Sequence, residues 1–223
     1  LLEKGKYRQA AQFAEQAIDT GSGDARVEGR VLLGEALASM GQNDSAEAQF
    51  TEARLAAPDN ARAAVGHGGV QFIKGDFEAA RTSFESALHA TEPKILQKSL
   101  LGLGKCRRQA QDLAGARLAL EEALRHKTSA FMRRSVHAEL AELALEAGDV
   151  PQAVFLAQQA QADGEDVRLK AILHEALENL RPQWDLPERI NNPLELKRVL
   201  VQLLSHTESD VRLPKFVPRI QRL

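Results

Sequence analysis

The stretch that decides the fold runs from Ala61 to Lys94 and reads ARAAVGHGGVQFIKGDFEAARTSFESALHATEPK. Its first half is a run of small and apolar residues that ends near Gly75. Its second half carries apolar residues at positions i, i+4 and i+7, which share one face of a helix. Those residues are Ala80, Phe84 and Ala87. The stretch therefore predicts two helices joined by a turn at Gly75.

Four columns of this stretch recur along the chain. Two alanine columns are Ala10, Ala46, Ala80, Ala116, Ala153 and Ala17, Ala53, Ala87, Ala123, Ala160. The turn column is Gly5, Gly41, Gly75, Gln111, Gly148, and the helix-packing column is Gly34, Gly68, Gly104, Ala141. Successive members of the first alanine column are 36, 34, 36 and 37 residues apart. The extra residues fall in turns, which tolerate insertion, so the chain is interpreted as a repeat protein.

The columns also carry a resemblance to a known family. Its residues are Leu33, Gly34, Ala46, Phe50, Ala53 and Pro58 in the second unit, Gly68, Phe77, Ala80, Phe84 and Ala87 in the third, Leu103, Gly104, Ala116 and Ala123 in the fourth, and Leu140, Ala153 and Ala160 in the fifth. A period of about 34 residues with these types resembles the tetratricopeptide repeat. The sequence departs from the pattern at Gln111 and Ala141 and lacks the early Trp. The resemblance implies an all-α fold, a right-handed α-solenoid (superhelix) of antiparallel helix pairs.

The repeats divide the chain into two parts. Residues 1–180 are predicted to form the array: a partial first repeat, four full repeats and a terminal helix over Asp166–Leu180. The partial repeat is expected to have its turn at Gly5-Lys6-Tyr7 and a helix from Arg8 to Thr20, so the natural protein is expected to continue upstream. Residues 181–223 are predicted to hold a proline-containing connection, an amphipathic helix over Pro193–Ser205 and an extended tail.

Composition excludes several classes of protein. The chain is 43% apolar and only 4% aromatic, which favours helix over sheet. A formal net charge of -2 offers no basic field for nucleic acid. The single cysteine, Cys106, excludes an internal disulfide framework, and no apolar run is long enough to span a membrane. Composition suggests a bacterial source, whereas the compartment stays open between cytoplasm and periplasm.

No catalytic or metal-binding pattern stands out. Leu101 to Lys105 superficially resembles a phosphate-binding loop, but it lies inside a predicted helix, so close helix packing at Gly104 is the preferred interpretation. The six histidines lack the spacing of metal ligands. Cys106 has no partner pattern for nucleophilic catalysis and is interpreted as a small buried residue. We therefore predict a protein that is not an enzyme and that needs neither cofactor nor metal.

The family resemblance implies a concave groove lined mainly by the first helix of each repeat. In the second unit the implied residues are Glu28, Val31, Glu35, Ala38 and Ser39. The candidate partner-binding residues are Arg62, Val65, Gly69, Phe72, Ile73, Lys98, Leu101, Lys105, Arg108 and Glu142. An apolar middle beside the basic Lys98, Lys105 and Arg108 favours a partner with an acidic residue next to an apolar one. The alternative is a solvated charged face that binds no partner.

The run Gly66-His67-Gly68-Gly69 has two interpretations. Glycines weaken a helix, so they need a reason, and tight helix packing through Gly68 is the simpler one. The functional alternative is that Gly69 lets the backbone of a bound peptide approach closely.

Three functions follow from these observations. The leading one is a scaffold that binds a protein or peptide in the groove, as part of a longer multidomain or assembly protein. The second is self-assembly into a homo-oligomer. The third is a regulatory arm of an enzyme or signalling protein whose active domain lies outside this chain.

Overall fold

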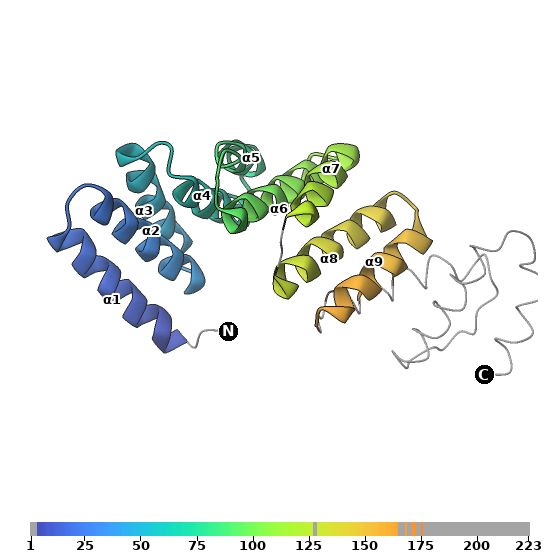
Figure 1. Cartoon of the computed structure of the whole chain (residues 1–223), viewed down its shortest axis with the longest axis horizontal. Coiled ribbons are helices and arrows are strands. Elements are labelled where there is room, and N and C mark those ends of the chain that lie inside the picture. The colour runs from blue at the N-terminus through green and yellow to red at the C-terminus, as the bar shows by residue number, and fades with distance from the viewer. Residues whose placement is uncertain (1–3, 127–128, 165–167, 169–170, 173–174, 176–223) are drawn as a thin grey trace, which may run out of the picture. The chain divides into compact units, whose positions relative to one another are not determined.

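The computed structural model describes residues 4–126, 129–164, 168, 171–172 and 175. Within these residues the regular secondary structure is helical throughout (Figure 1). The helices are α1 (Lys4–Thr20), α2 (Asp24–Ser39), α3 (Asn43–Ala56), α4 (Ala61–Lys74), α5 (Phe77–Glu85), α6 (Pro93–Gln109), α7 (Leu113–Arg125), α8 (Ala130–Glu146) and α9 (Val150–Ala162). The predicted all-α repeat fold is confirmed. Most of the predicted helix over Asp166–Leu180, and all features predicted for residues 181–223, lie outside the described residues.

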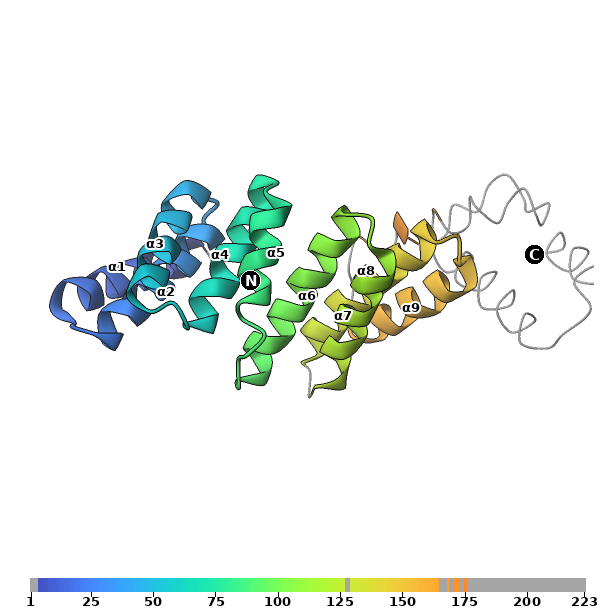
Figure 2. The ribbon, with the colours of Figure 1, turned by 90° about the horizontal axis from the view of Figure 1, so that it is seen from above.

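The chain divides into two compact units, residues 1–127 and residues 128–223. In the first unit, the pairs α2–α3, α4–α5 and α6–α7 each form one repeat, and α1 packs against α2 (Figure 2). Helices α2, α4 and α6 also contact one another in that order. In the second unit, α8 and α9 form one further pair. The first helices of consecutive repeats thus make a shared surface in the first unit.

The predicted turn column is confirmed at four of its five positions. Gly41, Gly75 and Gly148 have φ values of 79°, 86° and 76°, in the left-handed region that ends a helix. Gln111 takes the same place with φ 60° although it has a side chain. The turn predicted at Gly5-Lys6-Tyr7 is wrong, because α1 already begins at Lys4 and runs through these residues.

An N-cap follows the turn directly in three of the repeats. The carboxylates of Asp76, Asp112 and Asp149 each accept a hydrogen bond from the backbone N–H three residues on, at 3.2, 2.9 and 3.1 Å. These bonds satisfy one of the free donors at the start of α5, α7 and α9. In the second repeat Gln42 occupies the place and caps nothing. A left-handed residue followed by Asp therefore ends one helix and starts the next.

Two phenylalanine rings hold consecutive repeats together through pairs of glycines. A Cβ built on Gly34 or Gly66 would come within 2.8 or 2.3 Å of the Phe50 ring. A Cβ on Gly68 or Gly102 would likewise come within 3.0 or 2.4 Å of Phe84. Each ring therefore packs against a glycine of its own repeat and one of the next. Gly68 and Gly104 are explained by packing, as predicted, and the simpler interpretation of Gly68 is confirmed.

The alanine columns lie where helices cross. Their members in the second to fifth repeats are 0% exposed: Ala46, Ala53, Ala80, Ala87, Ala116, Ala123, Ala153 and Ala160. In α1, by contrast, Ala10 is exposed, and Ala11 and Ala14 are buried instead. The column register thus holds from the second repeat onward.

Candidate functional site

A surface hollow of about 530 Å³ opens on the first helices of the repeats in the first unit. We call it the hollow. Its walls come from α2 and α4, with contributions from α1, α3 and the first turns of α6. Most of its lining residues are apolar, and its ionisable groups besides Tyr7 are Glu35, Arg62 and Lys98.

The structure brings half of the predicted groove residues together at this hollow. Arg62, Val65, Gly69, Ile73 and Lys98 line it. Phe72 is only partly buried and contacts the Phe77 ring, with centroids 5.1 Å apart, rather than lining the hollow. Leu101, Lys105 and Arg108 lie further along α6 and do not line it either, and Glu142 lies on α8 of the second unit. Partner binding by these five residues stays a prediction.

The prediction that Val31 lines the groove is wrong. The family resemblance implies Val31 as a groove residue, but its side chain is 0% exposed and belongs to the core around Phe50. Its neighbour Leu32 lines the hollow and is 42% exposed. Adjacent helical residues point about 100° apart, so Val31 and Leu32 face different sides of α2. Because both are apolar, the sequence alone does not tell which of them faces the core.

Arg62 is held by two carboxylates of the preceding repeat. Its Nε and Nη2 atoms donate to the two carboxylate oxygens of Glu35, at 2.9 and 2.5 Å. Its Nη1 donates to Glu28 at 3.3 Å. The hydrogen bonding to Glu35 is the main reason why the pKa of Arg62 is raised. Glu35 therefore neutralises Arg62 within the hollow, and the pair also ties α4 to α2.

Lys98 is the basic residue of the hollow whose charge is not paired with a carboxylate of the described residues. Within the part of the chain that the structure describes, its ammonium group has no ion pair or hydrogen bond. Lys105 and Arg108, by contrast, both take part in interactions within the chain. Among the residues that line the hollow, the formal charges of Glu35 and Arg62 cancel and that of Lys98 remains, while Glu28, which does not line it, also bonds Arg62.

Apolar side chains are exposed beside this charge. Ile73 is 64% exposed although it lies on a first helix of a repeat. Val65 is half-buried on the same helix, one turn before Gly69, and Leu32 faces them from α2. A Cβ built on Gly69 would meet nothing within 4 Å. The hollow thus combines an apolar floor, an open glycine and one lysine.

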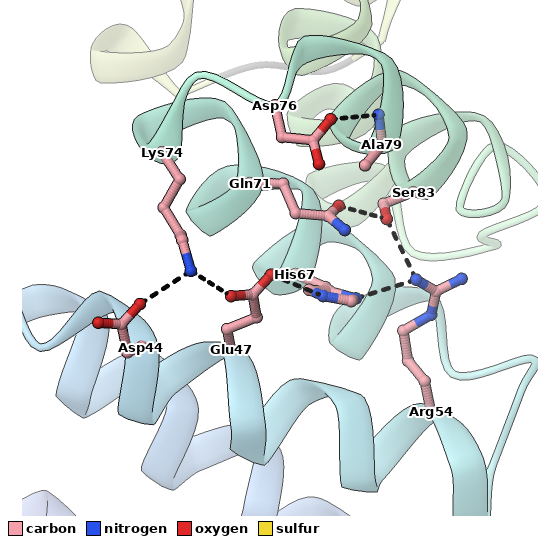
Figure 3. A network of polar contacts seen from close by, with 9 residues as sticks. All are labelled: Asp44, Glu47, Arg54, His67, Gln71, Lys74, Asp76, Ala79 and Ser83. Carbon is pink, nitrogen blue, oxygen red and sulfur yellow. Dashed lines mark hydrogen bonds and ion pairs between the residues drawn. The ribbon is translucent and has the colours of Figure 1, made fainter.

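A second polar cluster joins α3, α4 and α5 (Figure 3). Arg54 Nη1 lies 3.0 Å from His67 Nδ1 and donates to Ser83 Oγ at 3.1 Å. Because a guanidinium only donates, His67 Nδ1 must accept, and the ring proton therefore sits on Nε2. His67 Nε2 faces Glu47 Oε1 at 3.7 Å. The pKa of His67 is lowered, chiefly by burial and then by the Arg54 charge.

The same cluster continues to the ends of its helices. Lys74 Nζ donates to Asp44 at 2.8 Å and to Glu47 at 2.6 Å. The hydrogen bond from Lys74 lowers the pKa of Asp44. Ser83 Oγ in turn donates to Gln71 at 2.7 Å. The cluster fastens the second repeat to the third and does not border the hollow.

The described residues contain no group of three or more ligands suited to a metal ion. Cys106 is buried, and burial raises the pKa of its thiol to about 11, so little thiolate exists at neutral pH. Among the helices that the structure describes, none has the length and apolar character needed to cross a membrane.

Comparison with known proteins agrees with the fold. A family model described as "Tetratricopeptide repeat" matches residues 31–94. Tetratricopeptide repeat protein 1 of Schizosaccharomyces pombe is 25% identical over 141 residues, which are 63% of this chain and 14% of that protein. The chain is similar in structure to a chain of the APC/C hetero-tetramer Cut9-Hcn1, with TM-score 0.66 and 15% identity over 92% of this chain and 37% of that one.

Two shorter proteins of known structure are matched almost from end to end. PilW, described as a widely conserved type IV pilus biogenesis factor, has TM-score 0.66 and 18% identity over 95% of this chain and 90% of its own. YrrB, described as a TPR protein with an unusual peptide-binding site, has TM-score 0.57 and 18% identity over 91% of this chain and 100% of its own. At these identities the structural likeness shows a shared fold. The chain spans a small part of the first relatives named above.

Proposed function

We propose that this chain, whose residues 31–94 match the tetratricopeptide repeat family model and whose described helices share its fold, is a non-enzymatic scaffold that binds a protein or peptide in the hollow. Repeat arrays present extended surfaces to partners because consecutive units align the same face. The observation that carries the proposal is the hollow itself, where exposed apolar side chains surround one lysine without a partner in the described structure. A fold relative described by its peptide-binding site supports it.

The partner's chemistry follows from the charges of the hollow. Because Glu35 neutralises Arg62, an acidic side chain of the partner would be attracted only weakly to Arg62. Lys98 has no such neighbour, so an acidic group on the partner would be attracted to it. Leu32, Val65 and Ile73 favour an apolar side chain beside that group. The proposed partner is a protein or peptide with an acidic residue close to an apolar one.

The chain is also proposed to work as part of a longer protein or an assembly. The curated relative is several times longer than the matched segment. One structural relative is seen in a hetero-tetramer and another is a pilus biogenesis factor. These comparisons support the proposal without naming this chain's own partner.

A charge reversal tests the proposed site. Lys98→Glu places a carboxylate beside the apolar floor and should weaken partner binding at least about tenfold, since two like charges brought together at an interface cost about 1.4 kcal/mol or more. Arg117→Glu makes the same charge change at an exposed position of α7 that does not line the hollow. The measurement is quantitative pull-down from the source cell's lysate at about 0.15 M salt, with both variants checked for helicity.

The outcomes separate the candidate functions. Partners that are lost with Lys98→Glu and kept with Arg117→Glu would support the hollow as the binding site. Equal capture by all three proteins would refute it. Capture of the chain by itself alone, with a mass that rises with concentration, would favour self-assembly.

A further inference from the structure

We infer that His67 forms a proton-sensitive joint: when its ring takes up a second proton, α3 separates locally from α4, and the side of the hollow formed by Phe50 opens. This change goes beyond the proposed function, because it is a property of the fold that needs no ligand. A ligand bound in the hollow would be released by it.

The side chains that hold α3 on α4 lie on one face of α3. Glu47, Phe50 and Arg54 follow one another at intervals of three and four residues, so they point in the same direction from the helix. Phe50 lines the hollow, and its ring fills the space beside Gly66 of α4. Glu47 and Arg54, one turn to either side of Phe50, both face the ring of His67. The polar contacts of His67 therefore bracket the aromatic contact that borders the hollow.

The ring of His67 fits these contacts only when it is neutral (Figure 3). Its Nδ1 atom accepts from the Arg54 guanidinium, 3.0 Å away, and a guanidinium cannot accept in return. A proton on Nδ1 would bring two N–H groups and two positive charges together. Turning the ring over does not help, since Nε2 also carries a proton in the charged form. Arg54 must therefore move away, because the side chain of His67 is only 12% exposed and has little room of its own.

The other groups around the ring do not offset this repulsion. Glu47 faces Nε2 of His67 at 3.7 Å, but Lys74 already donates to the same carboxylate at 2.6 Å. Helix α5 contributes only the hydroxyl of Ser83, which accepts from Arg54. Within the described residues, no charged group of α2, α5 or α6 contacts the ring. Burial and the Arg54 charge accordingly outweigh Glu47 and lower the pKa of His67.

The departure of Arg54 loosens two helices at once. The same guanidinium nitrogen donates to Ser83 of α5 at 3.1 Å, so its movement removes a polar link from α3 to both α4 and α5. Lys74 still ties the start of α3 to the end of α4 through Asp44 and Glu47. The separation should therefore be widest at the Arg54 end of α3. Because each repeat contacts only its neighbours, α6 and α7 can stay folded while this joint opens.

Hydrogen–deuterium exchange of the backbone amides tests the inference. The full 223-residue chain is labelled at about pH 7.5 and about pH 5, on either side of the ordinary histidine pKa. Protection factors, corrected for the intrinsic exchange rate at each pH, are then compared helix by helix. We expect those of α3 and α4 to fall about tenfold, since each pH unit below the pKa of the open form shifts the opening by up to about tenfold. Protection in α6 and α7 should fall much less.

Two histidine variants make the test specific. His67→Asn keeps an amide oxygen as the acceptor for Arg54 but does not titrate, so α3 and α4 should keep their protection within about twofold between the two pH values. His89→Asn is the matched control, because it removes an exposed histidine of the same unit, whose ring lies beside the Asp59 carbonyl and outside the cluster. The His89 variant should respond to acid as the wild type does.

Three outcomes would overturn the inference. An equal fall of protection in all helices from α1 to α7 would mean that acid destabilises the whole array and opens no local joint. A fall in His67→Asn as large as in the wild type would assign the response to another group. Should His67→Asn fail to fold, nitrogen NMR of the wild-type ring decides: the proton is expected on Nε2 at about pH 7.5, and a ring that titrates at or above about 6.5 would refute the joint.

Discussion

At the residue scale, both glycine and glutamine adopt the left-handed backbone conformation that ends the first helix of a repeat. Gly41, Gly75 and Gly148 end their helices with positive φ at no steric cost. Gln111 adopts the same conformation with φ 60°, where its Cβ is crowded by the backbone. The repeat geometry imposes this conformation, because the following Asp112 must be in place to cap α7. The fourth repeat therefore carries local strain that its neighbours lack.

Gln111→Gly should relieve that strain. We expect the free energy of unfolding to rise by about 1 kcal/mol, because the left-handed conformation costs a residue with a Cβ about 1–2 kcal/mol and glycine loses part of this gain through its flexible unfolded state. Urea denaturation followed by circular dichroism measures the change. Gln109→Gly, two residues earlier at the end of α6, should instead lower stability. An equal effect of both substitutions would contradict the assignment of the turn.

Gly66→Ala should have the opposite effect from a substitution at Gly69. The added Cβ would come within 2.3 Å of the Phe50 ring, which is itself only 1% exposed and has little room to move. Overpacking of this kind costs about 1–3 kcal/mol. Gly69→Ala, three positions along α4, should stabilise the helix by up to about 1 kcal/mol. Thermal denaturation of the two variants compares the signs, and a matching sign would show that the packing at Phe50 is misassigned.

At the element scale, the junction between the second and third repeats depends on polar as well as apolar contacts. Helices α3, α4 and α5 meet at His67, whose side chain is only 12% exposed. Arg54 donates to one ring nitrogen, Glu47 faces the other, and Lys74 neutralises Glu47 from the end of α4 (Figure 3). The neutral imidazole fits this arrangement, whereas a protonated ring would direct a second N–H at the Arg54 guanidinium. The junction is therefore sensitive to acid.

Stability should fall as the pH drops below about 6.5, the ordinary pKa of an exposed histidine. Because the pKa of His67 is lowered in the folded protein, the unfolded chain binds more protons in this range, and protonation favours unfolding. The loss should level off once the pH is below the folded pKa. A separate loss should begin only near the ordinary carboxylate range, where Asp44 and Asp163 bind protons in the unfolded chain while their lowered pKa values keep them ionised in the folded protein. The measurement is the urea midpoint of the chain between pH 7.5 and about pH 3, which reaches below the ordinary pKa of aspartate.

His67→Asn supplies the control for that profile. The amide oxygen of asparagine can replace Nδ1 as the acceptor for Arg54 but does not titrate. The variant should have a smaller slope of stability against pH between 7 and 5 than the wild type. His137 in the second unit also has a lowered pKa, chiefly from burial, so part of the slope should remain. An unchanged slope would assign the acid sensitivity to residues other than His67.

At the scale of the whole molecule, the described chain consists of two units with separate sets of contacts. Every residue that lines the hollow, and every member of the cluster around His67, lies within residues 1–127. In repeat arrays each unit contacts only its neighbours, so a set of consecutive repeats can fold without the rest. The first unit therefore contains what the proposed binding requires.

A fragment of residues 1–127 should fold and bind on its own. We expect it to unfold cooperatively, to show the helical content of α1 to α7, and to bind the partner with an affinity within about threefold of the full chain, since no lining residue is removed. Circular dichroism and titration measure these properties. A folded fragment that no longer binds would show that residues beyond Lys127 contribute to the site. A fragment that does not fold would contradict the independence of the unit.

The repeat and the contacts within each unit could be predicted from the sequence. Turn residues and small residues at helix crossings are set by local backbone geometry and by close approach, so they recur at a fixed spacing. Gln111 could be assigned to the turn column, and Gly68 and Gly104 to packing, because each position has the same local requirement in every unit. These features can be predicted from the sequence because each depends on contacts and backbone geometry that every repeat shares.

Which of the candidate residues lie together on one surface could not be predicted without the structure. Lys98, Lys105 and Arg108 form one basic cluster in the sequence, yet Lys98 alone among them lines the hollow. Val31 is buried whereas its neighbour Leu32 lines the hollow, and Arg62 is neutralised by a carboxylate 27 residues away. The orientation of a helix about its axis and the pairing of side chains between repeats depend on packing between distant segments. A one-dimensional pattern does not record that packing, and for this reason the site required the structure.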